Sequence, residues 1–141
     1  MASGWMEPDA CRSLMVLVET VTAPLLIRHP AAVCLELDIE ADLPIPCDKR
    51  RTADLIAALT QQALAAMPDG GDLTITGCRT CDGIELEIAD SGDDVKHRER
   101  HLPIAAGAIQ ADLEWKNCPQ GGVAVTIVFP PGQSSQQRLA A

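Results

Sequence analysis

The stretch that most constrains the fold runs from Asp48 to Gly92 and combines a helix, a Gly-Gly turn and two strands. Asp48 is a good helix N-cap, and neither proline nor glycine interrupts the chain before Pro68. The residues between them are rich in Ala and Leu, which favour helix. An apolar stripe recurs among them at helical spacing: Leu55, Ile56, Leu59, Ala63, Ala66 and Met67. The Pro-Asp-Gly-Gly sequence at 68–71 then ends the helix and turns the chain.

The second half of this stretch predicts a β-hairpin. Apolar side chains alternate with threonine over 73–76 and with glutamate over 84–88, which is typical of strands with one buried face. The second strand stops at Asp90, and Gly92 follows two residues later. A carboxylate at the end of a sheet, next to a glycine that lets backbone approach a ligand, suits a binding site. Gln62 lies at the edge of the helical apolar stripe, from which its side chain can reach round towards the sheet.

The helix-turn segment 55–71 and the strand end 83–92 resemble two boxes of the ATP-binding domain of sensor histidine kinases. That domain belongs to a superfamily shared with gyrase, Hsp90-type chaperones and anti-sigma-factor kinases. In the family, the second Asn of the N box ligates the magnesium on the phosphates. The Asp of the next box, Asp-x-Gly-x-Gly, accepts a hydrogen bond from the adenine amino group. The resemblance extends over roughly residues 12–130 and implies a two-layer α/β sandwich, with a mixed sheet of about five strands and about three helices on one face.

The two boxes match only in part. Ala63 takes the place of the N-box Ala, so Gln62 stands where the magnesium Asn would be. Asp90 and Gly92 match the Asp and the first Gly of the next box, whereas Asp94 replaces the second Gly. Glutamine keeps an oxygen ligand but adds a methylene, and magnesium tolerates geometric error poorly. The nucleotide-binding residues, if the function is retained, are therefore Gln62, Asp90, Gly92 and Asp94, with Gln62 as a weak metal ligand.

The phosphate-binding part departs further from the family. After Gly92 the family has a long mobile lid and a Gly-rich box, whereas 93–112 is a short charged stretch in which His101-Leu102-Pro103-Ile104 stands in the place of that box. A short helix is expected from Ile104 to about Ala111. The stretch lacks the glycines whose accessible backbone N–H groups would bind the phosphates, so the phosphate-binding loop is missing. The resemblance implies ATP and magnesium as ligands, and these departures predict that they bind weakly or not at all.

Composition limits the class of protein. At 141 residues, of which 47% are hydrophobic, the chain is expected to be one globular domain. Aromatic residues make up only 2%, so the core must be aliphatic. A formal net charge of -9 disfavours nucleic acid and anionic membranes as partners. No apolar run approaches the roughly 20 residues of a membrane-spanning helix, and the N-terminus lacks a signal-peptide pattern, so a cytoplasmic location is expected.

The expected organisation is a flexible start over 1–8, a single domain over 9–131 and a disordered polar tail over 132–141. Asp9 is expected to cap a first helix that reaches about Val21 or beyond, with Pro24 marking a kink or an end. Alternating patterns predict three further strands, over 33–39, 113–116 and 123–129. Val123 occupies a position where the family commonly has a Thr near the adenine.

Simpler structural roles compete with the functional ones. Gln62 can be a helix-edge amide in solvent, and Asp90 can close an Asx turn with the residues that follow. Asp93 and Asp94 are expected to be solvated loop charges rather than magnesium ligands. The charged run Lys96–His101 could hold a phosphate, but a solvated loop is the expected role.

The six cysteines do not suggest a disulfide scaffold. Cys11 and Cys34 lie in apolar runs and are expected to be buried thiols. Cys78 and Cys81 form a CxxC pair in the predicted hairpin loop, where a zinc site would need two more ligands. We expect this pair to be loop thiols.

Three functional hypotheses remain. The first is a degenerate histidine-kinase-like domain, a pseudokinase that acts in two-component signalling by contact with a signalling protein such as a kinase, a response regulator or a sigma-factor regulator. The second is an active ATP-binding domain of a sensor histidine kinase or an anti-sigma-type kinase. The third is a phosphotransfer protein with a decayed ATPase-like domain, which would need a phosphoacceptor His on a helical hairpin that neither His97 nor His101 offers. The altered magnesium and phosphate boxes favour the first.

Overall fold

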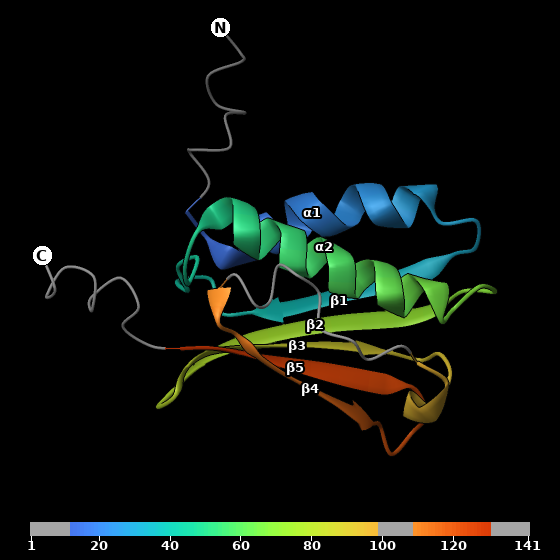
Figure 1. Ribbon diagram of the computed structural model, residues 1–141. Helices are drawn as coiled ribbons and strands as arrows, with labels where there is room; N and C mark the ends of the chain where they lie inside the picture. Colours follow the sequence, from blue (N-terminus) through green and yellow to red (C-terminus); the bar gives the residue numbers. More distant parts are fainter. Residues whose placement is uncertain (1–11, 99–108, 131–141) are drawn as a thin grey trace, which may run out of the picture.

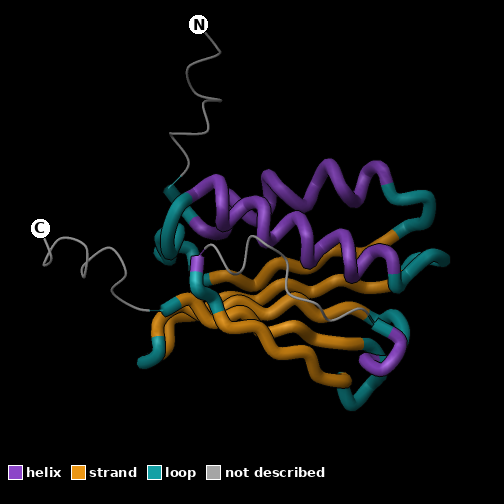
Figure 2. Tube along the Cα trace, in the orientation of Figure 1, coloured by secondary structure: helices purple, strands orange, loops and turns teal. Residues whose placement is uncertain are grey.

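Two α-helices lie on one face of a five-stranded sheet in the computed structural model, which describes residues 12–98 and 109–130 (Figure 1). Helices and strands form two separate layers, so the predicted two-layer α/β sandwich is confirmed (Figure 2). The third helix expected from Ile104 falls mostly outside the described residues, as do the expected flexible start and polar tail. The elements in chain order are α1 (Leu14–Arg28), β1 (Val33–Ile39), α2 (Lys49–Ala65), β2 (Gly71–Thr80), β3 (Gly83–Asp90), the 3-10 turn η3 (Val95–His97), β4 (Asp112–Asn117) and β5 (Val123–Phe129).

The sheet is mixed, in the order β1-β2-β3-β5-β4. β1 and β2 are parallel and are joined through α2, because parallel neighbours need a crossover connection. The remaining pairs, β2 with β3, β3 with β5 and β4 with β5, are antiparallel. Ala89 pairs with Ala124, so β3 ends where β5 begins. This register places the residues after Asp90 beside the start of β5 and the end of β4.

Helix α2 begins as its sequence predicts, whereas α1 does not. The Asp48 carboxylate accepts a hydrogen bond from the Arg51 N–H at 3.0 Å, which is an N-cap. The prediction that α1 begins after Asp9 is wrong for residues 12 and 13, because the helix begins at Leu14 with Ser13 as its cap. The chain at the start of the helix pairs instead with the segment before α2, where the Leu14 N–H donates a hydrogen bond to the Leu43 carbonyl at 3.0 Å.

Pro24 lies inside α1, and the helix continues past it to Arg28. A proline inside a helix removes one backbone hydrogen bond, which would orphan the carbonyl of Thr20. Both Thr20 and Pro24 are exposed, so water can satisfy that carbonyl. Of the two readings of Pro24, an end or a kink within a longer helix, only the longer helix is compatible with the structure.

The core between the layers is aliphatic, as composition predicts. Every second residue of the central strands faces the helices, and Phe129 is the one aromatic side chain in the buried cluster of the described residues. The fully buried side chains include Leu14, Val18, Leu55, Ile56, Leu59, Leu73, Ile75, Leu86, Ile88 and Ile127. The opposite sheet face has no helix over it in the described part of the chain (Figure 1).

That open face carries acidic side chains at alternate positions. Asp38, Glu87 and Glu114 lie in one row across the sheet, with Thr76 and Thr126 between them. Cys34 belongs to the same face of β1 and is exposed, so the prediction of a buried thiol there is wrong. The strand alternation decides its position: a residue two before Glu36 must share the glutamate's face. Cys11, the other cysteine expected to be buried, lies outside the described residues.

Candidate functional site

The structure brings two of the four predicted site residues into one cavity. Gln62 on α2 and Asp90 at the end of β3 both line a small space between the helix and the sheet. Gly92 and Asp94 lie in the segment that follows β3 and do not line that space. Asp94 is exposed, whereas Gly92 packs against the C-terminal end of α2.

Asp90 is a buried carboxylate whose oxygens already have several donors. Its side chain is 3% exposed. Oδ1 accepts hydrogen bonds from the Gly92 N–H at 2.8 Å and from Arg98 Nη2 at 2.6 Å, and Oδ2 accepts one from Arg98 Nη1 at 3.0 Å. The contact with Gly92 is the predicted Asx turn. The contact with Arg98 is a two-pronged ion pair, which is the strongest form of charge-assisted hydrogen bond.

Arg98 is the residue that sequence reasoning missed. Its side chain is only 10% exposed, and its Nη2 also donates to the Asp93 carbonyl at 2.8 Å. Its buried Nε atom has no hydrogen-bond partner among the described residues. Lys96 and His97 are exposed, as expected of a solvated run, but Arg98 turns inward. The sequence offered one signal, a charged run within eight residues of Asp90, because a carboxylate that becomes buried needs a cation or hydrogen-bond donors.

Three small residues let the backbone close tightly around Asp90. A Cβ on Gly92 would lie 2.5 Å from the Ala66 carbonyl oxygen at the end of α2. A Cβ on Gly122 would overlap the carbonyl oxygen of Asp90 itself. Ser91 Oγ accepts from the Asp72 N–H at 2.9 Å, which ties the segment to the start of β2. The close approach that the glycine at position 92 permits is therefore to the protein's own helix.

The turn η3 is held by Asp94 and Asn117. Asp94 Oδ1 accepts from the Lys96 N–H at 2.9 Å, so this carboxylate caps η3. Asn117 at the end of β4 accepts from the Val95 N–H at 2.8 Å and donates to Asp94 Oδ2 at 3.2 Å. The Lys96 backbone hydrogen bond, followed by the Asn117 contact and nearby positive charge, lowers the pKa of Asp94. Asp94 and Asn117 thus fix the position of η3, the turn from which the Arg98 side chain reaches Asp90.

Two cavities meet at Arg98. The inner one, of about 10 Å³, is lined by aliphatic side chains together with Gln62, Asp90, Arg98 and Trp115. A space of that size holds about one water molecule. The outer one, of about 240 Å³, is open to solvent and is lined by Gln62, Ala65, Ala66, Asp93, His97, Arg98 and Trp115. Gln62, Arg98 and Trp115 line both cavities.

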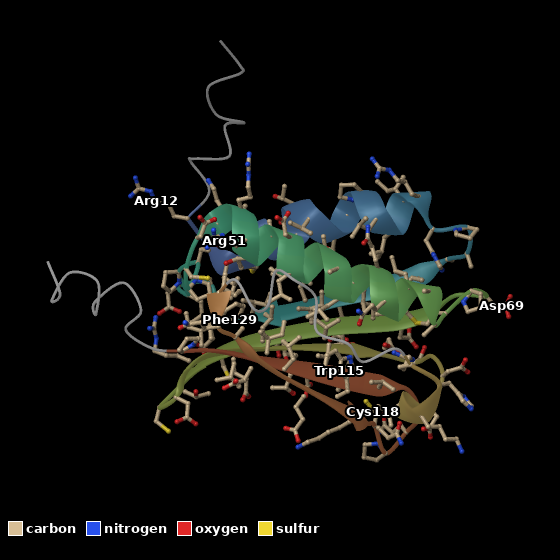
Figure 3. The ribbon with its side chains drawn as sticks, viewed as in Figure 1. Arg12, Arg51, Asp69, Trp115, Cys118 and Phe129 are labelled. Carbon is tan, nitrogen blue, oxygen red and sulfur yellow. The ribbon has the colours of Figure 1, made fainter. Side chains whose placement is uncertain are left out.

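Trp115 and Cys118 lie towards the η3 end of the sheet, and Phe129 lies towards the other end (Figure 3). Burial, followed by the negative charges of Glu87 and Asp90, raises the pKa of the Cys118 thiol. Val123, at the position where a Thr was expected from the family, is buried and lines the inner cavity. Cys78 and Cys81 are both free thiols. Cys81 lies in the β2–β3 turn as predicted, whereas the prediction of a loop thiol is wrong for Cys78, which lies within β2 and pairs with Glu85 of β3.

No family model matches this chain. Among curated proteins, it is similar to the adaptive-response sensory kinase SasA of Synechococcus sp. (strain CC9311), with 34% identity over 70 residues. That match covers 48% of this chain and 18% of the kinase, so the chain spans less than a fifth of its relative's length.

The structural similarity is broader. The mycobacterial sensor histidine kinase MprB has 16% identity and a TM-score of 0.67, over 84% of this chain and 94% of that one. The catalytic domain of histidine kinase ThkA has 17% identity and a TM-score of 0.65, over 84% of this chain and 93% of that one. Acinetobacter baumannii histidine kinase AdeS has 21% identity and a TM-score of 0.67, over 84% of this chain and 66% of that one. The chain therefore has the fold of the catalytic, ATP-binding domain of histidine kinases, as its two sequence boxes predict.

Proposed function

We propose that this chain is a degenerate histidine-kinase-type domain that acts in bacterial two-component signalling. In this proposal it works in the cytoplasm by contact with a signalling protein, and it binds ATP weakly or not at all. The observation that carries the proposal is the pairing of Asp90 with Arg98. The carboxylate that the family resemblance assigns to adenine already accepts both prongs of a guanidinium.

The space beside Asp90 also argues against a nucleotide. Pockets that hold small molecules are typically about 300–1,000 Å³, whereas the inner cavity is about 10 Å³. A nucleotide base would have to displace the Arg98 side chain and break its hydrogen bonds to Asp90 and to the Asp93 carbonyl. The residues present do not fit the base in this arrangement.

The residues expected to serve magnesium and phosphate have other partners or the wrong length. Asp94 is committed to capping η3 and to Asn117. Gln62 is the one N-box side chain with an oxygen near the cavity, and its extra methylene misplaces that oxygen relative to an asparagine. Among the residues that the structure describes, no group of three or more His, Cys, Asp or Glu side chains could hold a metal ion.

The partner class follows from the fold. Histidine kinases that contain a domain of this fold act together with other signalling proteins. The proposed partner is therefore a kinase, a response regulator or a sigma-factor regulator. In the part of the chain that the structure covers, no helix is long and apolar enough to cross a membrane.

The partner proposal can be tested with purified proteins. The intact chain would be titrated by calorimetry with receiver domains and with histidine-kinase fragments of its source organism, with and without ATP. We expect saturable binding to one of them that does not depend on ATP. Transfer of labelled phosphate from ATP to a kinase or regulator by the intact chain would overturn the proposal and support an active kinase domain instead.

A further inference from the structure

The open face of the sheet, which is turned away from α1 and α2, has no element packed on it among the described residues (Figure 1). Its side chains come from alternate positions of the strands. Three strands, β1, β3 and β4, each contribute two carboxylates to it: Glu36, Asp38, Glu85, Glu87, Asp112 and Glu114. Six negative charges are therefore gathered on a face that the packing of the two layers does not use.

Little positive charge balances the open face. Among the described strand residues that belong to it, Lys116 is the one cation, and its Nζ lies 3.7 Å from Glu114 Oε1. Both side chains of this pair are about two-thirds exposed, so the pair adds little to stability. Like charges on one surface repel each other and destabilise the compact state. Folding alone therefore gives no reason for this pattern, whereas a positively charged partner does.

The open face is hollowed along β5. A groove of about 660 Å³ runs between the acidic side chains of β3 and those of β4, with Thr126 and Val128 of β5 between them. β3 and β4 are each one strand away from β5, so the two acidic rows are roughly 10 Å apart. That width is about the diameter of an α-helix with its side chains. The groove floor is uncharged, and its walls are negative.

The spacing along the groove also fits a helix. Glu85 and Glu87 on one wall, like Asp112 and Glu114 on the other, are two residues apart on a strand and so roughly 7 Å apart. Side chains four residues apart on a helix are roughly 6 Å apart along its axis, and long basic side chains can bridge the difference. A helix in addition satisfies its own backbone hydrogen bonds, which an extended segment lying over the side chains of a sheet would not.

We propose that the open face docks a basic amphipathic α-helix of a partner protein, with small apolar residues over β5 and with Lys or Arg on both flanks. This inference rests on the proposed function, because it assigns the surface through which the chain contacts a signalling protein. Charge complementarity defines the partner, since each flank of the helix meets a row of carboxylates. The open face of a second copy does not fit, because it carries the same negative charge.

The test uses the intact chain and a designed, fluorescein-labelled peptide. The peptide has roughly 16 residues, which as a helix match the length of β5, with alanine on the central stripe and lysine on both flanks. A side-chain staple on its outer face keeps it helical, since isolated helices of this length are marginal in water. Fluorescence anisotropy measures binding at about 0.15 M salt, where the Debye length is about 8 Å and distant charges contribute little.

We expect saturable binding of this peptide to the intact chain. A stapled peptide of the same composition in scrambled order carries the same charge without the two lysine flanks. It should bind on the order of tenfold more weakly, because it cannot meet both acidic rows at once. Equal binding of the two peptides would mean that the open face only attracts cations, and the inference would be overturned.

Charge variants of the chain locate the site. Glu85→Gln with Glu87→Gln removes two charges from one wall of the groove and should weaken binding about tenfold. The matched control, Glu19→Gln with Asp54→Asn, removes two exposed carboxylates from α1 and α2 and should change the affinity less than about twofold. Lys116→Gln removes the cation of the groove and should strengthen binding about twofold, a gain that misfolding cannot produce.

A change at the groove floor separates seating of a helix from simple charge attraction. Thr126→Gln leaves the charge unchanged but lengthens a side chain between the two acidic rows, so it should weaken binding severalfold. Circular dichroism verifies that each variant folds. Unchanged binding in Thr126→Gln, or equal losses in the Glu85 and Glu87 variant and its control, would overturn the inference. Should that double variant fail to fold, Lys116→Gln decides, and binding that is not strengthened overturns the inference.

Failure of the proposed function gives a different result. Micromolar, magnesium-dependent binding of ATP by the intact chain would overturn the proposed function and would leave the peptide measurements unchanged. Absence of peptide binding by a chain that also fails to bind ATP would overturn the docking surface alone.

Discussion

Asp90 is held by one backbone N–H and two guanidinium nitrogens, so its two oxygens share three hydrogen bonds. Removing one member of such a buried pair leaves the other charge uncompensated, whereas replacing both with apolar residues does not. The two partners should therefore be strongly coupled in stability.

We predict that Arg98→Met lowers the free energy of unfolding by roughly 3 kcal/mol, because it strands the Asp90 carboxylate. The double variant Asp90→Leu with Arg98→Met should lose markedly less than the sum of the two single variants. Urea denaturation of the four proteins measures the coupling. Additive losses would show that the pair is not coupled in the folded chain.

Two adjacent glycines offer a matched comparison beside the same residue. Gly121 and Gly122 both have positive φ, at 102° and 89°, so alanine is strained at either position. A Cβ on Gly121 meets nothing within 4 Å, whereas one on Gly122 would overlap the Asp90 carbonyl oxygen. We predict a loss of about 1 kcal/mol for Gly121→Ala from backbone strain alone.

For Gly122→Ala we predict a loss of at least roughly 3 kcal/mol, since a steric clash with backbone adds to the same strain. Thermal and urea denaturation of both variants measure the difference. Equal losses would mean that the β5 start does not pack on the end of β3 as closely as the structure has it.

Local chemistry at Asp90 was predictable in part. The consecutive residues Asp90, Ser91 and Gly92 predict an Asx turn, and the hydrogen bond from the Gly92 N–H to the Asp90 carboxylate confirms it. The pairing with Arg98 depends on where η3 places the chain after a turn, which no residue pattern specifies. A charged run of six residues gives no local reason why its third member, and not its first, should be buried.

At the scale of elements, the short turn η3 determines which residue enters the site. It has only three residues and two backbone hydrogen bonds of its own, from the His97 and Arg98 N–H groups, so it also depends on bonds from neighbouring elements. Asn117 supplies two of these, to the Val95 N–H and to Asp94 Oδ2.

We predict that Asn117→Ala lowers the free energy of unfolding by about 1 kcal/mol, from two lost hydrogen bonds at an exposed position. It should also speed hydrogen exchange at the Val95 amide and at residues up to Arg98, measured by mass spectrometry. Asn117→Asp is the informative control, since it keeps an acceptor for Val95 but faces the Asp94 carboxylate. Unchanged exchange in Asn117→Ala would mean that β4 does not hold η3.

Elements with a strong apolar periodicity were predictable from the sequence, whereas the start of α1 was not. The α2 helix and all five strands follow from apolar spacing and alternation, because one face of each must be buried. The start of α1 was predicted too early, since backbone pairing between residues 12–14 and 43–45 competes with helix there. That pairing is long-range and leaves no mark on the residues near Asp9.

The cysteines should react with alkylating reagents according to their exposure. Cys34 and Cys81 are exposed, whereas Cys47 is partly buried and its Sγ lies 3.2 Å from Thr52 Oγ1. Burial is the main cause that raises the pKa of the Cys47 thiol above its ordinary 9.0, so the reactive thiolate is scarcer. We predict that iodoacetamide at pH 8 labels Cys34 and Cys81 before Cys47 and Cys118, as read by peptide mass spectrometry.

The same pKa shift has a consequence for stability. The folded chain holds the Cys47 proton more tightly than the unfolded chain does, so this contribution is complete below pH 9.0 and is lost as pH rises through the folded pKa. Cys47→Ala should therefore show a smaller loss of stability between pH 8 and pH 10 than the intact chain. Faster labelling of Cys47 than of Cys34 would contradict its placement in the structure.

At the scale of the whole molecule, the fold depends on the pattern of buried residues, whereas the site depends on the identity of a few side chains. The two-layer sandwich follows from periodic burial, and it is similar to the structure of the sensor histidine kinase MprB, which shares 16% of its residues with this chain. The same fold can therefore be kept while the residues that would bind a triphosphate change. The net charge of -9 adds to this, since it repels a polyphosphate that has no cation to screen it.

The most direct test of the account is a calorimetric titration of the intact chain with ATP at saturating magnesium. We predict no saturable heat up to about 1 mM ATP, a concentration that corresponds to roughly 4 kcal/mol of binding free energy. Magnesium-dependent binding in the micromolar range would contradict the claim that Arg98 keeps the carboxylate of Asp90 from a nucleotide.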